Sequence, residues 1–439
     1  MKRRLFHIFP ALLLPAAVIL TPGCLGNQRP SGHSGPQDQA ADDCPELAKD
    51  RWERSNKAVL DGFLHAYQPC VVEVPDPEFP YRMWFFGWIA EVANPEYAGC
   101  DAIYFARSRN LKQWEVYTKN GSWDASRNQE IWASVLHASE DQSRYYDQFH
   151  TGDPSVVLKD GIYHMAYSAT SRPFTEPESS EPVEPPMFSN LYIEGYPSRM
   201  IQCIMGATSE DGIHWIKTEK PLLIAAVDDH YPPDPSPGRI GDFHRPCLLW
   251  DPGEQVWKLY FDYHTALQGG TGKKWTDSME DFIAGRVDAG LAVNRSDFRT
   301  GTFTIAHPLE NPLLTNWPNP EVVRTGSCYY AFSDAFGYEG ATAPTGRTVS
   351  TWQKRQLQVA FSRDGIHWEK QYTIEPDPGI DADHVPQAFV CNRDGKWWLY
   401  LFYSTQVGWR HGVMDYPLFA AGEYNWFYDQ IRYMRQEIQ

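Results

Sequence analysis

Gly152-Asp153-Pro154-Ser155-Val156-Val157 is followed by the turn Lys159-Asp160-Gly161 and by the aromatic-rich run Ile162–Ala169. Both apolar runs have the length and the β-branched or aromatic content of strands. The Asp-Gly pair between them tolerates the positive φ that a tight hairpin turn requires. These residues therefore predict an antiparallel hairpin whose first strand starts at Asp153-Pro154.

Five weak copies of this hairpin occur along the chain. Their first strands read Gln68-Pro69-Cys70-Val71-Val72, Asp153-Pro154-Ser155-Val156-Val157, Arg245-Pro246-Cys247-Leu248-Leu249, Asn319-Pro320-Glu321-Val322-Val323 and Val385-Pro386-Gln387-Ala388-Phe389. Their second strands are predicted over Met83–Trp88, Ile162–Ala169, Val256–Tyr263, Cys328–Ser333 and Lys396–Ser404. Successive prolines lie 85, 92, 74 and 66 residues apart, so long insertions must separate the compact parts of the repeat.

A second pattern, typical of a strand, a tight turn and another strand, follows the hairpins. It reads Ser209-Glu210-Asp211-Gly212-Ile213-His214-Trp215 and Ser362-Arg363-Asp364-Gly365-Ile366-His367-Trp368, with looser forms over Ala106–Trp114 and Val293–Phe298. The unit thus has four antiparallel strands, and radial repetition of such units gives a propeller. We predict an all-β, five-bladed β-propeller. The fifth copy lacks this pattern, so its outer part comes either from Arg410–Leu418 or from the N-terminal segment.

Three long segments, 170–199, 264–285 and 334–355, fall between predicted second and third strands. In a propeller blade these connections share one face with the residues that precede the repeat prolines. The short Asp-Gly turns share the opposite face. Long loops gathered on one face of a rigid scaffold indicate that binding occurs there.

The first 24 residues are typical of an export signal that ends in a lipidation site. A basic start, MKRR, precedes an apolar run through Leu20 that is short for a membrane span. Thr21-Pro22-Gly23-Cys24 resembles a bacterial lipobox, so we expect a lipid on Cys24 and anchoring to a bacterial membrane; ordinary signal-peptidase cleavage nearby is the alternative. Residues 25–42 are interpreted as a flexible tether, and the propeller is expected over residues 43–439.

The 439 residues include 39 Lys and Arg against 56 Asp and Glu, a formal net charge of −17. This balance argues against a nucleic-acid partner and against polybasic binding to anionic lipid, so membrane contact is expected only through the N-terminal lipid. The cysteines show no disulfide framework, and most are interpreted as small buried residues. Cys70 and Cys100 are candidate partners for Cys44, but no pairing is predicted.

The residues that precede the repeat prolines are expected to point toward the propeller axis, where acids and histidines gather. The carboxylates expected to be catalytic are Asp153, Glu321, Asp242 and Asp383, and the side chains expected to bind substrate are Gln68, Trp88, Asp101, His244, Arg245, Asn319 and His384. Glycosidic cleavage needs one acid that protonates the leaving oxygen and one carboxylate that attacks or activates water. Crowding of like charges would raise the pKa of one of them. For each residue the alternative is structural: a strand cap, an ion pair, a loop contact or the core.

Gly152-Asp153-Pro154-Ser155-Val156 and Ser-x-Asp-Gly-Ile-His-Trp resemble repeats of the five-bladed propeller glycoside hydrolases. These comprise the arabinanase and β-xylosidase type of family 43 and its invertase-like and agarobiose-hydrolase-like relatives. The resemblance covers roughly residues 65–410 and implies three acids at the starts of the inner strands of blades one to three. Asp153 matches the acid that tunes the pKa of the proton donor and holds the sugar. Gln68 stands where the resemblance implies the base.

Blade three also departs from the pattern that the resemblance implies. It offers Arg245 and His244, with Asp242 three residues before the arginine, and blade four offers Glu321. One consequence is a displaced constellation, with Asp242 or Asp383 as base and Glu321 or a histidine as acid. The other is loss of hydrolysis with retained sugar binding.

The sequence thus predicts an exported glycoside hydrolase that cleaves an oligo- or polysaccharide by paired-carboxylate chemistry in an axial pocket. The alternatives are a non-catalytic carbohydrate-binding propeller at the cell surface and a protein-interaction scaffold. No cofactor and no resident metal are predicted because no ligand spacing indicates one, although axial carboxylates are able to hold Ca²⁺.

Overall fold

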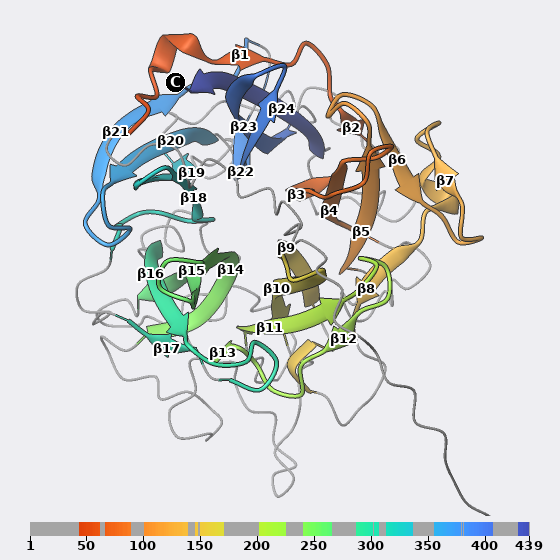
Figure 1. Cartoon of the computed structure of the whole chain (residues 1–439), viewed down its shortest axis with the longest axis horizontal. Coiled ribbons are helices and arrows are strands. Elements are labelled where there is room, and N and C mark those ends of the chain that lie inside the picture. The colour runs from red at the N-terminus through yellow and green to blue at the C-terminus, as the bar shows by residue number, and fades with distance from the viewer. Residues whose placement is uncertain are drawn as a thin grey trace, which may run out of the picture. The chain divides into compact units, whose positions relative to one another are not determined.

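The computed structural model describes residues 44–61, 66–88, 101–138, 145–147, 150–170, 202–224, 240–265, 287–301, 303–306, 313–336, 355–378, 380, 382–406 and 429–438. All of them belong to one compact unit of the chain. They form five antiparallel sheets around a common axis (Figure 1), so the predicted five-bladed β-propeller is confirmed. Cys24, the tether and nearly all of the three long segments lie outside the described residues.

Each blade is built on four antiparallel strands. Blade one contains β3 (Tyr67–Glu73), β4 (Tyr81–Trp88), β5 (Asp101–Ser108) and β6 (Trp114–Tyr117), with β7 (Trp123–Asp124) and β8 (Ser134–His137) added. Blade two contains β9 (His150–Lys159), β10 (Ile162–Thr170), β11 (Gln202–Ser209) and β12 (Ile216–Lys217), with β13 (Leu223–Ile224) added. Blade three contains β14 (Ile240–Asp251), β15 (Val256–Thr265), β16 (Val287–Asn294) and β17 (Thr304–Ile305). Blade four contains β18 (Glu321–Thr325), β19 (Cys328–Phe336), β20 (Arg355–Ser362) and β21 (Glu369–Ile374).

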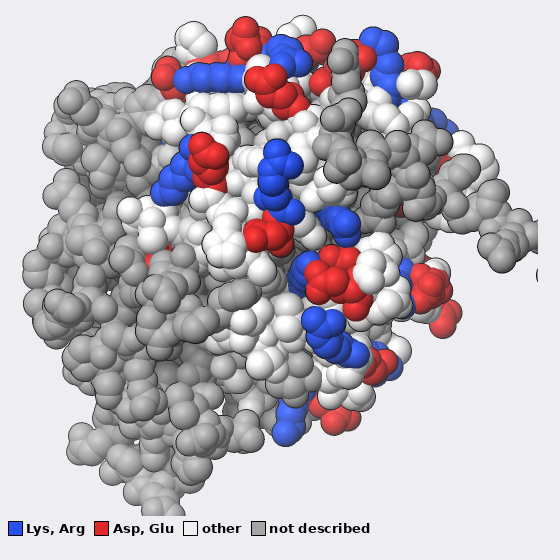
Figure 2. All heavy atoms as spheres, turned by 60° about the vertical axis from the view of Figure 1, so that its left-hand side comes forward, with Lys and Arg blue, Asp and Glu red and all other residues white. Residues whose placement is uncertain are grey.

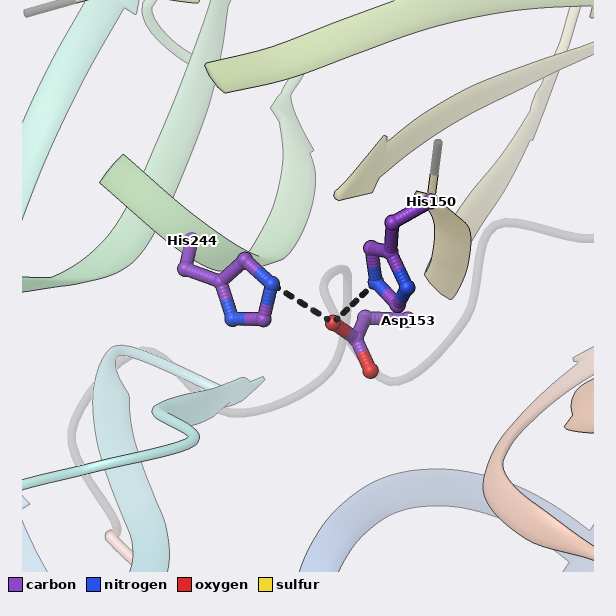
Figure 3. A group of neighbouring side chains, drawn as sticks. All are labelled: His150, Asp153 and His244. Atoms are coloured by element: carbon purple, nitrogen blue, oxygen red, sulfur yellow. Dashed lines mark ion pairs between the residues drawn. The ribbon is translucent and has the colours of Figure 1, made fainter. Parts of the chain in front are cut away.

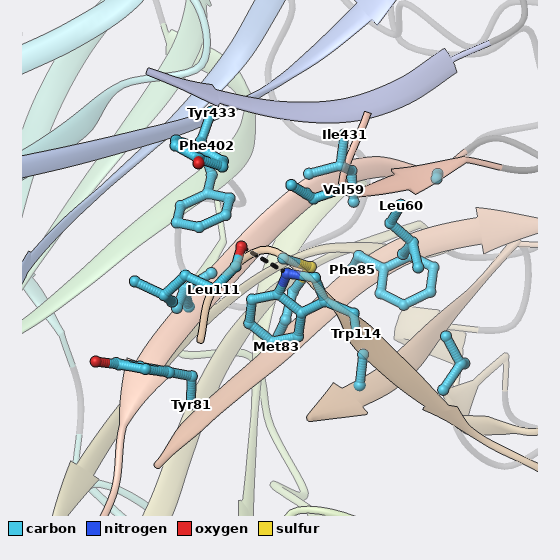
Figure 4. Packing of buried hydrophobic residues seen from close by; sticks show 14 of the residues in the cluster. Val59, Leu60, Tyr81, Met83, Phe85, Leu111, Trp114, Phe402, Ile431 and Tyr433 are labelled. Atoms are coloured by element: carbon cyan, nitrogen blue, oxygen red, sulfur yellow. Dashed lines mark hydrogen bonds between the residues drawn. The ribbon is translucent and has the colours of Figure 1, made fainter. Parts of the chain in front are cut away.

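Blade five is completed by the N-terminal segment, which confirms one of the two predicted alternatives. It contains β22 (Ala382–Arg393), β23 (Lys396–Gln406), β24 (Asp429–Ile438) and β1 (Glu53–Arg54), with β2 (Leu60–Asp61) also paired to β24. Val59 and Leu60 pack against Ile431 of β24 in one buried cluster (Figure 4). The ring is therefore closed by residues from the two ends of the described chain. Short 3₁₀ helices occupy Lys49–Arg51, Gln129–Ile131 and Tyr145–Asp147.

A disulfide also ties the N-terminal segment to the propeller. Cys44 is bonded to Cys328 of β19, so Cys70 and Cys100 are not its partners. Cys70 is instead a buried free thiol. The same holds for Cys203, Cys247 and Cys391, which confirms that these cysteines are small core residues. Sequence spacing could not identify the pair because its two members are 284 positions apart and meet only when the ring closes.

The two predicted turn motifs have separate structural causes. Asp160 and Gly161 both have positive φ, 53° and 79°, as the hairpin between β9 and β10 requires. In the second motif, Asp211 Oδ1 accepts hydrogen bonds from the backbone N–H groups of Ile213 and His214, both at 2.8 Å. Asp364 makes the same two bonds in blade four. The Asp-Gly-Ile-His-Trp motif is therefore a turn motif that joins the outer strands of a blade.

The residue before each repeat proline adopts a left-handed conformation in all five blades. The φ angles are 41° at Gln68, 52° at Asp153, 44° at Arg245, 51° at Asn319 and 45° at Val385. Such a φ is uncommon outside glycine and is a genuine outlier for a β-branched valine. In blades one, two, three and five the strand starts before this residue and continues past it through a shift of register. The prediction that this residue starts the strand is wrong in those blades, because the residue lies inside the strand at an irregularity of the β-bulge type.

A ring of hydrogen bonds joins the five inner strands. In every blade the residue after the repeat proline accepts a bond from a backbone N–H of the next blade. The bonds run from Val156 N to Cys70 Sγ (3.2 Å), Leu248 N to Ser155 Oγ (2.8 Å), Val322 N to Cys247 Sγ (3.2 Å), Ala388 N to Glu321 Oε1 (2.9 Å) and Val71 N to Gln387 Oε1 (2.9 Å). Inner-strand edges that would otherwise be unpaired are thus satisfied from blade to blade.

Glu321 is the acidic member of this inter-blade ring, and its position predicts a pH-dependent stability. Burial raises the pKa of Glu321 to about 8, although the Ala388 N–H and the side chains of Cys247 and Gln387 lower it. Between the ordinary pKa and about 8, the folded chain holds a proton that the unfolded chain has released. The free energy of unfolding therefore falls as pH rises through this range.

Glu321→Gln keeps the acceptor for Ala388 N–H and removes the titration. We expect the variant to match the wild type near pH 5 and to exceed its free energy of unfolding by on the order of 3 kcal/mol at pH 8. Denaturant unfolding at the two pH values measures this difference. An identical pH slope for both proteins would contradict a protonated Glu321 in the folded state.

The described surface carries charges of both signs. Figure 2 shows Lys and Arg side chains beside Asp and Glu side chains over the described part of one face. Ion pairs such as Arg107 with Glu115 (2.8 Å) and Arg435 with Glu53 (2.8 Å) also occur among the described residues. No helix in the described part of the chain has the length and apolar character needed to cross a membrane.

Candidate functional site

Asp153 lies between two histidines at the inner edges of blades two and three. Its Oδ2 is 3.4 Å from His244 Nε2 and 3.8 Å from His150 Nε2 (Figure 3). The two imidazole rings are stacked, with centroids 5.6 Å apart. Asp153 is 2% exposed, whereas the side chain of His150 keeps 13% of its surface. The three side chains form a compact group that we call the His-Asp-His cluster.

Local backbone geometry brings this cluster together. His150 and Asp153 come from the same strand, β9, on either side of Gly152. A side-chain carbon at Gly152 would lie 2.5 Å from the ring of Phe86 and 2.9 Å from that of His150, so only glycine fits. Phe86 of β4 in turn packs against His150 with ring centroids 5.7 Å apart. The positive φ of Asp153 then turns its carboxylate toward both rings.

A second buried acid, Asp262, joins the site from blade three. Asp262 of β15 lies opposite His244 of β14 in the antiparallel register, and it is 1% exposed. Its Oδ2 accepts a hydrogen bond from the backbone N–H of Asn319 (2.9 Å) and lies 3.5 Å from Arg245 Nη1. Its Oδ1 has no hydrogen-bond partner among the described residues. The side chain of Arg245 is 20% exposed.

Blade four supplies a third buried acid, Asp334, which is occupied by structural contacts. Its carboxylate accepts bonds from Val385 N (2.6 Å) and from the side-chain amide of Asn319, and it pairs with Arg355 Nη1 at 2.9 Å. Arg355 lies 3.5 Å from His384 Nδ1, and His384 packs against Tyr67 with ring centroids 5.2 Å apart. These contacts link the inner ends of blades one, four and five.

The two acids nearest the histidines are pushed toward opposite protonation states. Burial opposes ionisation of Asp153, but His244, His150 and Arg245 outweigh it and hold the pKa of its carboxyl well below its usual range. Burial raises the pKa of Asp262 to about 6; Arg245 and the Asn319 N–H lower it, while the charge of Asp153 raises it. Opposed shifts in neighbouring carboxyl groups are typical of acid and base pairs in active sites.

The structure places the other predicted carboxylates elsewhere. Asp383, 1% exposed, is paired with Arg54 Nη1 of the closing strand at 2.9 Å and accepts a bond from Thr405 Oγ1. Burial raises the pKa of Asp383, although Arg54 and Thr405 lower it. Glu321 belongs to the inter-blade ring described above. The described partners of Glu321 therefore join two blades, whereas those of Asp383 are strands of its own blade, blade five.

Of the predicted binding residues, His244 and Arg245 lie beside Asp153. Asn319 contacts Asp262 and Asp334, and His384 lies beside Arg355, which pairs with Asp334. Gln68 is buried, and its backbone N–H is bonded to Ser404 Oγ at 3.0 Å. The side chains of Trp88, Asp101 and Asp242 lie outside the described residues, although their backbones belong to β4, β5 and β14.

Sequence reasoning missed His150, Asp262 and Asp334. A signal for the acids did exist. Asp262 and Asp334 occupy the same position in their second strands as Ser168 in blade two and Ser404 in blade five. All four side chains accept a hydrogen bond from the backbone N–H of the residue that precedes the repeat proline in the next blade. No comparable repeat signal marks His150.

The fold and the site define a five-bladed β-propeller with buried ionisable groups at its axis. The sequence matches no protein-family model and no curated protein. Among solved structures, a family 117 glycoside hydrolase from the marine bacterium Zobellia galactanivorans is similar at 13% identity and a TM-score of 0.51, over 88% of this chain and 90% of that one. The structure of a complex of BT0996 with RGII is similar at 14% identity and a TM-score of 0.50, over 86% of this protein and 90% of the other. A third structure, described as a glycoside hydrolase, has 13% identity and a TM-score of 0.51, over 86% of this chain and 90% of the other. The resemblance in fold to propeller glycoside hydrolases is thereby confirmed.

Proposed function

We propose that the protein is an exported glycoside hydrolase that acts on an oligo- or polysaccharide at the axial site. The observation that carries the proposal is the pair of buried acids, Asp153 and Asp262, whose pKa values are shifted in opposite directions. The fold shared with glycoside hydrolases supports the same class of reaction, and the net charge of −17 is compatible with an uncharged substrate.

Asp262 has the properties of the proton donor. With a pKa of about 6 it retains a proton in part of the molecules near neutral pH, and its Oδ1 is not engaged by described residues. It would protonate the oxygen of the leaving sugar. Asp153 remains ionised and would stabilise the positive charge that develops on the sugar or activate the attacking water. Arg245, the most exposed member of this group, would bind a substrate hydroxyl.

Hydrolysis is tested by measuring product release by the purified protein on a panel of plant and algal oligosaccharides. We expect release of a reducing sugar from at least one member of the panel. Binding measured by calorimetry without any product would support instead the non-catalytic carbohydrate-binding propeller. That second candidate is favoured by one observation, the presence of Gln68 where the resemblance implies a base. If the protein neither releases product nor binds any of the oligosaccharides, both the glycoside hydrolase and the carbohydrate-binding propeller are contradicted.

Export and a lipid at Cys24 are part of the proposal. The Cys44–Cys328 disulfide supports export, because disulfides persist in oxidising compartments. Membrane anchoring is tested by fractionating cells that express the full chain or Cys24→Ala. The wild type is expected with the membranes and the variant in the soluble fraction; equal distribution would contradict lipidation.

A further inference from the structure

We propose that the His-Asp-His cluster binds one divalent transition-metal ion, of the zinc type, through His150 Nε2, Asp153 Oδ2 and His244 Nε2. These three ligand atoms all lie within 4.8 Å of one another (Figure 3). Two imidazoles and one carboxylate on one side of an ion form a ligand set that suits zinc and neighbouring transition metals.

The distances from Asp153 Oδ2 to the two imidazole nitrogens fit coordination of one shared ion better than direct hydrogen bonds. Asp153 Oδ2 is 3.4 Å from one imidazole nitrogen and 3.8 Å from the other, both longer than the 2.7–3.2 Å of an N–H to O hydrogen bond. Two atoms bound tetrahedrally to one ion at about 2.1 Å lie about 3.4 Å apart. The buried Oδ2 of Asp153 has no hydrogen-bond partner among the described residues, although it is aimed between two rings. A cation between the three atoms would satisfy it.

The surroundings of the cluster are organised as a metal site requires. Phe86 packs on His150, and the absence of a side chain at Gly152 lets this contact form. Arg245 follows His244 in the chain but is directed to Asp262, at 3.5 Å, so its charge is balanced by a second acid. Calcium and magnesium are disfavoured as occupants because both prefer sets made of oxygen ligands.

Three protein ligands leave the remaining coordination positions for water or for oxygen atoms of a substrate. This inference builds on the proposed glycoside hydrolase function, because the ion would place hydroxyl groups of a sugar beside Asp262. The binding of the ion itself rests on the cluster geometry and does not depend on which bond is cleaved. An experiment can therefore contradict metal binding without contradicting glycoside hydrolysis, and the reverse.

The test uses the purified full chain after chelation with EDTA and dialysis. Calorimetric titration with ZnCl₂ is expected to show one ion per chain, with CaCl₂ binding at least about 100-fold more weakly. His150→Gln and His244→Gln are each expected to weaken zinc binding at least about 100-fold. His214→Gln is the matched control, because His214 lies in an exposed turn beside Asp211 and is expected to leave binding unchanged.

A second readout does not require hydrolysis or large calorimetric heats. The visible absorption of the Co²⁺-loaded protein is expected to report nitrogen and oxygen ligation and to disappear in His150→Gln, whose partly exposed side chain makes misfolding a small risk. Absence of stoichiometric Zn²⁺ and Co²⁺ binding by the wild type would overturn the proposal. So would binding that survives both cluster variants in chains whose circular dichroism is native.

Discussion

Asp153→Asn is expected to lower the rate of sugar release by on the order of 10³-fold while the protein stays folded. The substitution keeps the shape of the side chain and removes the charge that His150, His244 and Arg245 hold in place. Loss of a positioned charged group in an active site typically costs 10²–10⁴-fold in rate. The effect should fall mainly on kcat, because the charge acts on the transition state more than on the bound sugar.

Product release by the variant on the substrate identified from the panel measures this effect. Asp160→Asn is the matched control, because Asp160 lies exposed in the hairpin turn after β9, where asparagine also tolerates positive φ. Full turnover by a folded Asp153→Asn protein would remove Asp153 from the mechanism. Retained sugar affinity with lost turnover would separate catalysis from binding.

Arg54→Ala is expected to lower the free energy of unfolding by about 3–5 kcal/mol. Arg54 Nη1 lies 2.9 Å from Asp383 Oδ2 and 3.2 Å from the hydroxyl of Tyr403, and its Nη2 donates to the backbone carbonyl of Glu375. Asp383 is almost completely buried, so removal of Arg54 leaves an uncompensated charge inside blade five. Because Arg54 belongs to the strand that closes the ring, the contact between the first and last described strands is weakened as well.

Denaturant unfolding followed by tryptophan fluorescence measures the loss. Glu53→Ala, one residue away on the same strand, removes only a surface pair with Arg435 and is expected to cost less than about 1 kcal/mol. Arg54→Ala combined with Asp383→Asn should recover part of the stability, because the buried charge is then absent. If Arg54→Ala and Glu53→Ala lower the free energy of unfolding equally, the buried pair of Arg54 and Asp383 stabilises the fold no more than a surface pair.

The repeat pattern predicted the architecture because it is a local property of each blade. Asp160-Gly161 and Asp394-Gly395 adopt the positive φ angles that their residue types favour, and all five predicted second strands occur. Ring closure was left open between two segments for a physical reason. β1 has only two residues and no apolar periodicity, so its partnership with β24 arises from contacts such as that of Glu53 with Arg435, 382 positions away in the chain.

The site was predicted in part. Asp153, His244 and Arg245 were named because they flank the repeat prolines, and they do lie together. Glu321 also flanks a repeat proline, but it stands after it and bonds to the next blade. Successive side chains of a strand point to opposite faces. A difference of one or two positions along an inner strand therefore decides whether a residue belongs to the axial site or bonds to the next blade.

Residue order and residue type were enough to establish the number of blades, the strands within them and the hairpin turns, because these depend on neighbours in the chain. The folded ring was needed to pair Cys44 with Cys328, to set Asp262 opposite His244 and to aim Asp153 between two imidazoles. Each of these contacts joins separate strands or blades, and each carboxylate owes its pKa to charges and burial supplied by the others. Side-chain chemistry at the axis is therefore a property of the closed propeller, because only closure removes water and brings these charges within reach of one another.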